Sequence, residues 1–236
     1  MKSLKLSLNT LITILFVMTF IQMTAQDTEV IKVENFRNVN VIGRIDVEMQ
    51  QSDEAPSIEL NYEGIEREKI SIKVEDNTLT IKLVSTLSYE NIRVLVKIQY
   101  NEISKVNTYS SASVGSNEII KCDKISLSAE SGSEIILKLD AGEINSESVT
   151  GGILTLSGTA VKHTSKITTK STLSAGNLIC KEYDIEVKSK GIAKINVTAI
   201  IVARATTGGF ITYSGNPGKS SVDATLGGKI STTDLY

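Results

Sequence analysis

Apolar and polar residues alternate along the first half of the chain, as they do in β-strands that bury one face. Six short segments carry this pattern, at residues 39–41, 45–49, 58–62, 70–74, 79–83 and 92–98. Asp76 and Asn77 separate two of these segments, which have matched lengths, and predict a hairpin. Only residues 64–69 look helical, and they make barely one turn. The first half is therefore expected to be strand-rich.

Past residue 104 the apolar segments become shorter, and Gly, Ser and Thr recur between them. Residues 27–103 hold 9 Ser plus Thr and 2 Gly, whereas residues 104–236 hold 35 Ser plus Thr and 14 Gly. Residues 150–158 return as residues 207–215 with six of nine positions identical, an offset of 57. A second echo relates residues 125–128 to 185–188 at an offset of 60. Both offsets divide into three coils of about 19 or 20 residues.

These features predict an all-β chain whose second half winds into a parallel β-helix, a solenoid of roughly six coils. A single coil cannot bury its apolar side chains, but stacked coils share a continuous core. Gly tolerates the positive φ of tight corners, and Ser and Thr hydroxyls bond to nearby backbone. Residues 137–139, 167–170 and 195–197 supply strands for intermediate coils. The alternative is an antiparallel β-sandwich, and a parallel pairing of residue i with about i+20 would reject it.

The coil spacing also predicts the state of the two cysteines. Cys122 and Cys180 lie 58 residues apart, close to three coils. Three strand spacings of about 4.8 Å exceed the Cα separation of roughly 7 Å that a disulfide spans. We therefore expect two free, buried thiols.

Residues 1–25 have the layout of a cleaved signal peptide. Lys2 and Lys5 precede an apolar stretch of about 14 residues, and Ala25 offers a cleavage point before Gln26. A membrane-spanning helix needs roughly 20 residues, which leaves an uncleaved anchor as the weaker alternative. Removal of this segment leaves 23 basic and 27 acidic residues. The expected organisation is a signal peptide at 1–25, a strand-rich part at 26–103 and coils at 104–236.

Composition excludes several functions. The whole chain has 25 Lys plus Arg against 27 Asp plus Glu, so it lacks the basic excess of a nucleic-acid binder. A single His and two Cys exclude the usual zinc sites, and no cofactor or metal is expected. The lone His163 adjoins Thr164 and Ser165, but adjacent strand residues face opposite ways, which argues against a Ser-His pair. We expect His163 to face solvent.

The carboxylates Asp140, Glu143 and Glu147 are the remaining candidates for chemistry. On adjacent coils they could stack with the acidic residues Asp123, Glu130 and Glu134. Such a cluster would suit Ca²⁺ or a glycosidase. Solvated charges on an outer face are the favoured interpretation, because no Asp-x-Asp calcium repeat is present. The chain also has no Trp and only 5% aromatic residues, so it has few platforms for sugar rings.

Several segments together resemble a known family. They are the Ala25-Gln26 junction, residues 36–41 followed by 45–47, the Ser/Ala segment 110–114, and the segment GGFITYSGNP at 208–217. Over about residues 30–220 the chain resembles the secreted Bacteroidetes proteins described as putative auto-transporter adhesin, head GIN domain. It departs from that family at Ser111-Ala112-Ser113, where the family often has Gly. The resemblance implies a right-handed parallel β-helix and no established reaction.

Two functions follow as hypotheses. The first is a non-enzymatic exported protein of the periplasm, outer-membrane surface or extracellular space, an adhesin-like or structural module. It would present polar faces to a glycan or a surface protein, or associate with its own copies through the solenoid ends. After signal cleavage no membrane span is expected. The alternative is an exported polysaccharide lyase or glycoside hydrolase that uses Asp140, Glu143 and Glu147.

Overall fold

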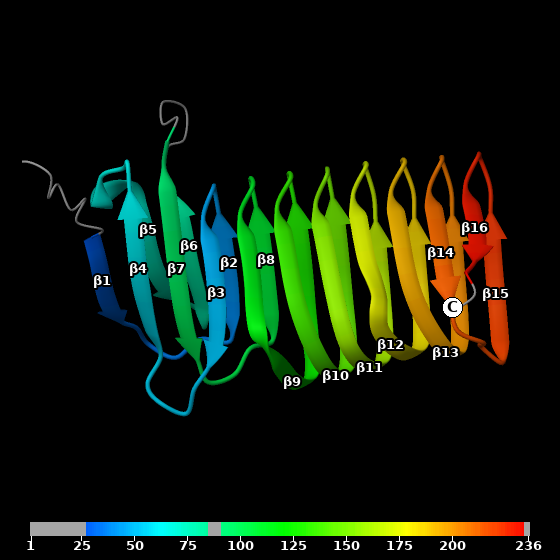
Figure 1. The fold of residues 1–236 in the computed structure, drawn as a ribbon, viewed down its shortest axis with the longest axis horizontal. Coiled ribbons are helices and arrows are strands. Elements are labelled where there is room, and N and C mark those ends of the chain that lie inside the picture. The colour runs from blue at the N-terminus through cyan, green and yellow to red at the C-terminus, as the bar shows by residue number, and fades with distance from the viewer. Residues whose placement is uncertain (1–26, 85–90, 234–236) are drawn as a thin grey trace, which may run out of the picture.

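The protein is an elongated all-β solenoid in which strands stack along the long axis (Figure 1). The computed structural model describes residues 27–84 and 91–233, so the predicted signal segment at 1–25 lies outside the described residues. The only helical element in this part of the chain is a 3-10 turn, η1 (Arg67–Lys69). It falls within residues 64–69, the one segment whose sequence looked helical.

Sixteen strands account for the rest of the regular structure in the described part of the chain. The first eight are β1 (Asp27–Lys32), β2 (Asn38–Ile42), β3 (Asp46–Gln51), β4 (Ser57–Glu63), β5 (Ile70–Glu75), β6 (Thr78–Leu83), β7 (Arg93–Tyr100) and β8 (Lys105–Tyr109). The others are β9 (Ser113–Glu130), β10 (Glu134–Val149), β11 (Ile153–Ile167), β12 (Thr172–Val187), β13 (Ile192–Ala205), β14 (Phe210–Ser214), β15 (Lys219–Ala224) and β16 (Lys229–Thr232). All six strands predicted in the first half are present.

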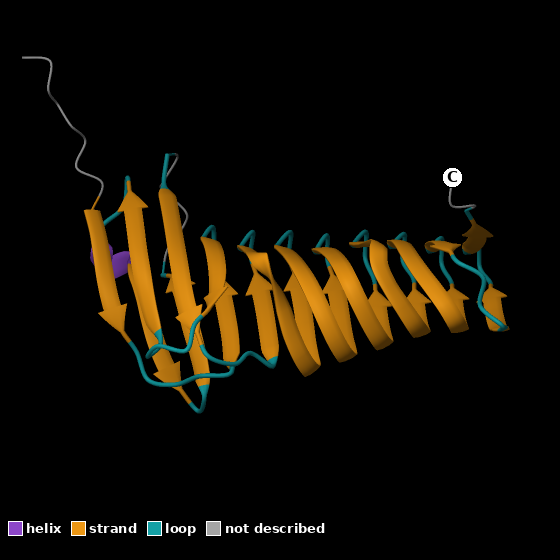
Figure 2. Ribbon diagram, turned by 60° about the horizontal axis from the view of Figure 1, so that its bottom comes forward, coloured by secondary structure: helices purple, strands orange, loops and turns teal. Residues whose placement is uncertain are grey.

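The strands form one continuous sheet that folds into two layers, called sheet A and sheet B, which face each other across the core. Sheet A runs β1-β4-β7-β3 and continues through the N-terminal halves of β9–β13 to β14 and β16. Sheet B runs β5-β6-β2-β8 and continues through the C-terminal halves of β9–β13 to β15. Strands β9–β13 are 14 to 18 residues long because each bends from sheet A into sheet B without a break (Figure 2). The expectation of short strands in this half was therefore wrong.

Neighbouring coils pair in parallel with the predicted spacing. Ile153 lies opposite Thr172, which lies opposite Ile192, which lies opposite Phe210. These steps are 19, 20 and 18 residues, so the repeat at an offset of 57 is three coils. Parallel pairing confirms the solenoid and rejects the sandwich.

The second echo is out of register by two residues. Three coils after Ile125 comes Tyr183, whereas the echo at an offset of 60 relates it to Ile185. The residue opposite Ile185, three coils back, is Leu127. An alternating strand resembles itself when it is shifted by two residues, which explains the false match.

One edge of the solenoid, the turn edge, is a stack of seven two-residue turns in which both residues have positive φ. The first residues are Ser110, Ser131, Thr150, Thr169, Ser189, Thr207 and Leu226, and the second are Ser111, Gly132, Gly151, Lys170, Lys190, Gly208 and Gly227. Each second residue, up to Gly208, donates its backbone N–H to the first residue of the next turn at 3.0–3.2 Å.

The stack of turns corrects the prediction of a strand at residues 167–170. It also shows the backbone geometry where the chain differs from the family that it resembles. Residues 168–170 are a turn, so the strand expected at 167–170 ends at Ile167. Ser111, the first residue of the departing segment Ser111-Ala112-Ser113, adopts with Ser110 the same left-handed pair as the Gly-containing turns. The corner geometry is therefore kept without glycine.

The N-terminal region, residues 27–104, has a more complex strand order than the solenoid. The hairpin β5–β6 is antiparallel, as predicted, and Asp76 and Asn77 both have positive φ in its turn. The coil made of β2 and β3 lies between the coil of β6 and β7 and the coil of β8 and β9. Strands β1 and β4 add to the outside of β7 in antiparallel pairs. The chain thus fills the first coils out of sequence order.

A single apolar core runs from Phe36 to Ile211 and consists mainly of Ile, Leu, Val and Ala. Cys122 and Cys180 are both free, as predicted, and Ala141 and Ala160 occupy the two intervening coils. Cys180 is buried, but Cys122 is only half-buried, so its expected burial was wrong. Stacked aliphatic side chains explain how a chain without Trp fills this core.

Candidate functional site

The outer surface of sheet B carries a polar groove of about 760 Å³ that crosses several coils. It is lined by Lys105, Asn107, Tyr109, Ser126, Leu127, Ser128, Glu130, Asn145, Ser146, Glu147, Thr164, Ser165, Lys166, Asp184, Glu186 and Arg204. Most of these residues stand at alternate positions of β8–β13, where side chains point outward. We call this surface the polar groove.

Two rows of side chains run along the polar groove, because the parallel register places equivalent residues opposite one another. The first row is Lys105, Ser126, Asn145, Thr164 and Asp184. The second row is Asn107, Ser128, Glu147, Lys166, Glu186 and Arg204. Neighbouring members of each row are about 4.8 Å apart, the spacing of paired strands. The groove therefore offers one polar group per coil in each row.

Charges in the polar groove are largely matched within it. Lys166 Nζ lies 3.6 Å from Glu147 Oε1, and Arg204 Nη1 lies 3.4 Å from Asp184 Oδ1. These pairs are exposed, so each adds little to folding stability. Three cationic and four anionic side chains line the groove, which leaves it nearly neutral. A polar but uncharged ligand suits such a surface better than a polyion.

The three candidate carboxylates are not brought together. Glu147 stands in the polar groove, opposite Lys166. Glu143 lies at the bend, where Lys124 Nζ is 3.1 Å away and Asn145 Nδ2 donates a 2.9 Å hydrogen bond. The hydrogen bonds from Asn145 and Lys124 lower the pKa of Glu143.

Asp140 lies in a different place, a cleft of about 850 Å³ at the bend edge of the solenoid, opposite the turn edge. Its carboxylate accepts a 2.9 Å hydrogen bond from Thr159, and Asp123 lines the same cleft. Cys122 is there too, and burial, followed by the charges of Asp123 and Asp140, raises its pKa. Burial also raises the pKa of Tyr100, on the cleft wall, to about 12. The thiol and the phenol are thus both held in their protonated forms.

The other acidic residues named with the candidates are also separated from them by register. Glu134 lies opposite Ser113 and Ile153, and Glu130 lies opposite Tyr109 and Val149. Within residues 27–84 and 91–233, no group of three or more His, Cys, Asp and Glu side chains could hold a metal ion.

His163 is fully buried, so the expectation that it faces solvent was wrong. It lies opposite Ile144 and Tyr183, and its ring centroid is 4.6 Å from that of Tyr183. Burial lowers the pKa of His163 to about 3, so the ring is neutral. Position 163 shares its parity with the inward residues Ser165 and Ile167, but the sequence does not mark the bend that sets this parity.

His163 does form a pair with a serine, but a structural one. Ser146 Oγ donates to Ser165 Oγ at 2.9 Å, so the 2.7 Å bond between His163 Nε2 and Ser146 is donated by the imidazole. In the described part of the chain, His163 Nδ1 and the Tyr183 hydroxyl have no hydrogen-bond partner. A catalytic triad needs an acid at Nδ1 and a nucleophile that a substrate can reach. This pair lies inside the core and has neither.

The fold and its outer surface define a class, the β-solenoid proteins that carry polar rows along a rigid sheet. The chain belongs to the family described as putative auto-transporter adhesin, head GIN domain, which it matches over residues 35–217. No curated protein matches the chain. Across the described residues, no helix is long and apolar enough to cross a membrane.

Solved structures with the same fold include proteins from Bacteroides and Parabacteroides species. A putative adhesin from Bacteroides fragilis has a TM-score of 0.77 and 18% identity, over 89% of this chain and 98% of that chain. A putative adhesin from Parabacteroides merdae has a TM-score of 0.71 and 19% identity, over 89% and 97% of the two chains. A putative lipid binding protein from Parabacteroides distasonis has a TM-score of 0.69 and 18% identity, over 89% and 98%. At these identities the likeness shows a shared fold.

Proposed function

We propose that this chain is an exported, non-enzymatic, adhesin-like module that binds an extended uncharged glycan along the polar groove. The observation that carries this proposal is the pair of polar rows, which place a hydroxyl, amide or charged group at each coil. Glycan hydroxyls both donate and accept hydrogen bonds. A row with one polar side chain per coil can therefore bond to successive sugar units of an extended glycan. Because the rows stand on a rigid sheet, little conformational entropy is lost on binding.

A glycan array probed with the purified chain tests this function. Two substitutions on the same strand, β11, make a matched pair: Thr164→Trp fills the polar groove, whereas Thr155→Trp stands on the outer surface of sheet A. We expect Thr164→Trp to abolish binding to the glycans found on the array and Thr155→Trp to leave it unchanged. Equal effects of the two variants, or an empty array, would overturn the proposal.

Export is part of the proposal and has its own test. The layout of residues 1–25 supports secretion and a mature chain in the periplasm, at the outer-membrane surface or outside the cell. Expression in the source organism, followed by fractionation and N-terminal sequencing, should give a mature chain that begins at Gln26. A full-length chain in the cytoplasmic fraction would contradict export.

The cleft at the bend edge favours a second candidate, an exported polysaccharide lyase or hydrolase. The observation for it is that Asp123 and Asp140 share this cleft with Tyr100. Glycosidases use two carboxyl groups, one of which acts as a general acid. A reducing-end assay with polysaccharide substrates separates the two functions. Release of new reducing ends that is lost in Asp140→Asn would establish the enzyme, whereas binding without release supports the adhesin-like module.

A second copy of the same chain is a further partner to test. In the described residues the outer edges of β15 and β16 pair with no strand, and such edges can template strand addition. Sedimentation velocity over a range of concentrations should show chains larger than the monomer. A monomer at every concentration would remove this partner.

A further inference from the structure

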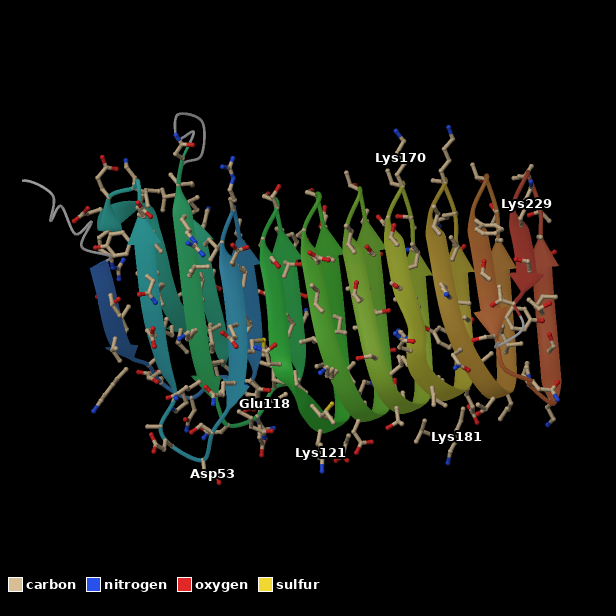
Figure 3. The ribbon with its side chains drawn as sticks, viewed as in Figure 1. Asp53, Glu118, Lys121, Lys170, Lys181 and Lys229 are labelled. Carbon is tan, nitrogen blue, oxygen red and sulfur yellow. The ribbon has the colours of Figure 1, made fainter. Side chains whose placement is uncertain are left out.

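The turn edge has an unusual feature in its middle coils. Four of its seven turns have Gly at the second position, where φ is positive, but Lys170 and Lys190 occupy that position in two adjacent coils with φ of 60° and 62°. A side chain is strained in this region, and Gly is not. Figure 3 shows Lys170 extending beyond the turn edge, away from the sheets. Ser111 and the first residue of every turn also have positive φ without being Gly, so what distinguishes Lys170 and Lys190 is their charge at this exposed edge.

An exposed apolar row runs beside these lysines on the outer surface of sheet A. Ile153, Ile192 and Phe210 belong to one row of the parallel register, with Thr172 between the first two. Their exposed fractions are 38%, 50% and 38%. Lys170 and Lys190 stand two residues before Thr172 and Ile192, so the lysines line the apolar row along the turn edge.

The cations of this surface are not neutralised by the protein. Lys166, Lys188 and Arg204 form ion pairs nearby, but within the described residues none is recorded for Lys170, Lys190 or Lys194. The alkyl chain of Lys194 lies over Gly176 on the neighbouring coil, next to the apolar row. Positive charge and exposed apolar side chains therefore share one surface.

We infer that this basic apolar edge docks on a lipid membrane that contains anionic lipids. Lysines near an anionic membrane bind its head groups, and apolar side chains beside them insert at the boundary of the acyl chains. Long lysine side chains reach the head groups while their alkyl stems stay on apolar surface. A soluble polyanion would engage the lysines but leave the apolar row in water. The polar groove lies on the other sheet, so this inference does not rest on glycan binding.

Vesicle co-sedimentation of the mature chain tests the charge requirement. We expect binding to phosphatidylcholine vesicles that contain phosphatidylglycerol, weaker binding at high salt, and little binding to pure phosphatidylcholine. Lys170→Gln with Lys190→Gln should weaken binding about 30-fold, since each lysine near an anionic surface contributes roughly a fivefold factor. Lys121→Gln with Lys181→Gln is the matched control, because these lysines extend from the opposite, bend edge (Figure 3).

Equal losses from the two double variants, or no binding to the anionic vesicles at low salt, would overturn the inference. Binding to dextran sulfate without binding to vesicles would also overturn it, in favour of a soluble polyanion site.

To separate folding defects from binding defects, the lysines are replaced with Gly, the residue that four of the other turns have at this position. Lys170→Gly with Lys190→Gly should raise the unfolding midpoint, because Gly relieves the positive φ, and should still weaken vesicle binding about 30-fold. If the Gly variant kept full vesicle binding, the lysines would have no docking role.

The apolar part of the surface can be followed by fluorescence, because the chain has no Trp. Phe210→Trp places a single indole in the apolar row, and Tyr109→Trp places one in the polar groove as a control. Anionic vesicles should shift the emission of Phe210→Trp to shorter wavelengths and leave that of Tyr109→Trp unchanged. An unshifted Phe210→Trp in vesicle-bound protein would contradict insertion of this row.

Discussion

The N-terminal region and the solenoid use the same inward aliphatic residues but differ in how their strands find partners. From β10 onward each coil pairs with the coils directly before and after it in sequence. In the N-terminal region β2 and β3 pair only with strands that come much later in the chain, β6 to β9. Strand β1 pairs with β4, and two other strands lie between them in sequence. The difference shows that a repeated local pattern suffices for stacking, whereas closing the first coils needs long-range contacts.

Truncation of one core isoleucine in each region gives the largest expected effect. Ile98 in β7 and Ile195 in β13 are both fully buried, and Ile→Ala at either site should cost about 4 kcal/mol of folding stability. In the solenoid the loss should raise hydrogen exchange mainly in the coils around β13, since contacts reach only neighbouring coils. Ile98→Ala should raise exchange throughout the N-terminal region. The same exchange pattern in both variants would contradict the comparison.

The second largest expected effect is the loss of folding stability when a side chain is added where neighbouring coils stack closely. A Cβ on Gly152 would lie 2.1 Å from the Ala129 carbonyl oxygen of the preceding coil, whereas one on Gly151 would meet only the Gly132 nitrogen at 4.0 Å. Gly152→Ala should cost about 3 kcal/mol through this overlap. Gly151→Ala should cost about 1 kcal/mol through its positive φ alone. Urea unfolding that ranks the two variants in the reverse order would reject the stacking argument.

The buried His163 makes the solenoid sensitive to acid. Its folded pKa of about 3 lies below its unfolded value, so the unfolded chain binds the extra proton first. Stability from this residue is therefore complete above the unfolded pKa, near 6.5, and decreases as pH falls toward 3. The loss should reach about 2 kcal/mol at pH 5. Urea unfolding of His163→Phe should lack this component, and an unchanged pH dependence would show that other groups cause it.

The smallest expected change in folding stability comes from a substitution in the β5–β6 hairpin of the N-terminal region. Asn77 has a φ of 60° in the β5–β6 turn, a conformation that Gly adopts with less strain. Asn77→Gly should stabilise the protein by roughly 0.5 kcal/mol. Asn40→Gly in the middle of β2 is the control and should destabilise it by about 1 kcal/mol. Thermal unfolding that shifts in the same direction for both variants would count against the turn assignment.

Much of the fold could be predicted because its signals are local. Alternation located the strands of the N-terminal region, and the Asp76-Asn77 pair located a hairpin. The repeat at residues 150–158 and 207–215 gave the coil length, and with it the separation of Cys122 from Cys180. The lengths of β9–β13 were missed because a bend in a continuous strand leaves no turn signal.

The candidate sites were harder to predict, because the side that a residue faces changes at the bend. In β11, Leu154 and Leu156 point inward on sheet A, but on sheet B the inward residues are His163, Ser165 and Ile167. Even positions face the core before the bend and odd positions after it. A shift of one residue moves every following side chain to the other face, so counting by two from Leu156 places His163 outside.

The sequence by itself determined the all-β solenoid, the coil of 19 or 20 residues and the two separate thiols, because alternation and repetition are properties of neighbouring residues. Tertiary structure alone decided the order of the first coils, the burial of His163 and the separation of Asp140, Glu143 and Glu147. Each of these depends on which residues the register places opposite one another. Register is set by the bends and by the shared core of all coils, which no single segment contains.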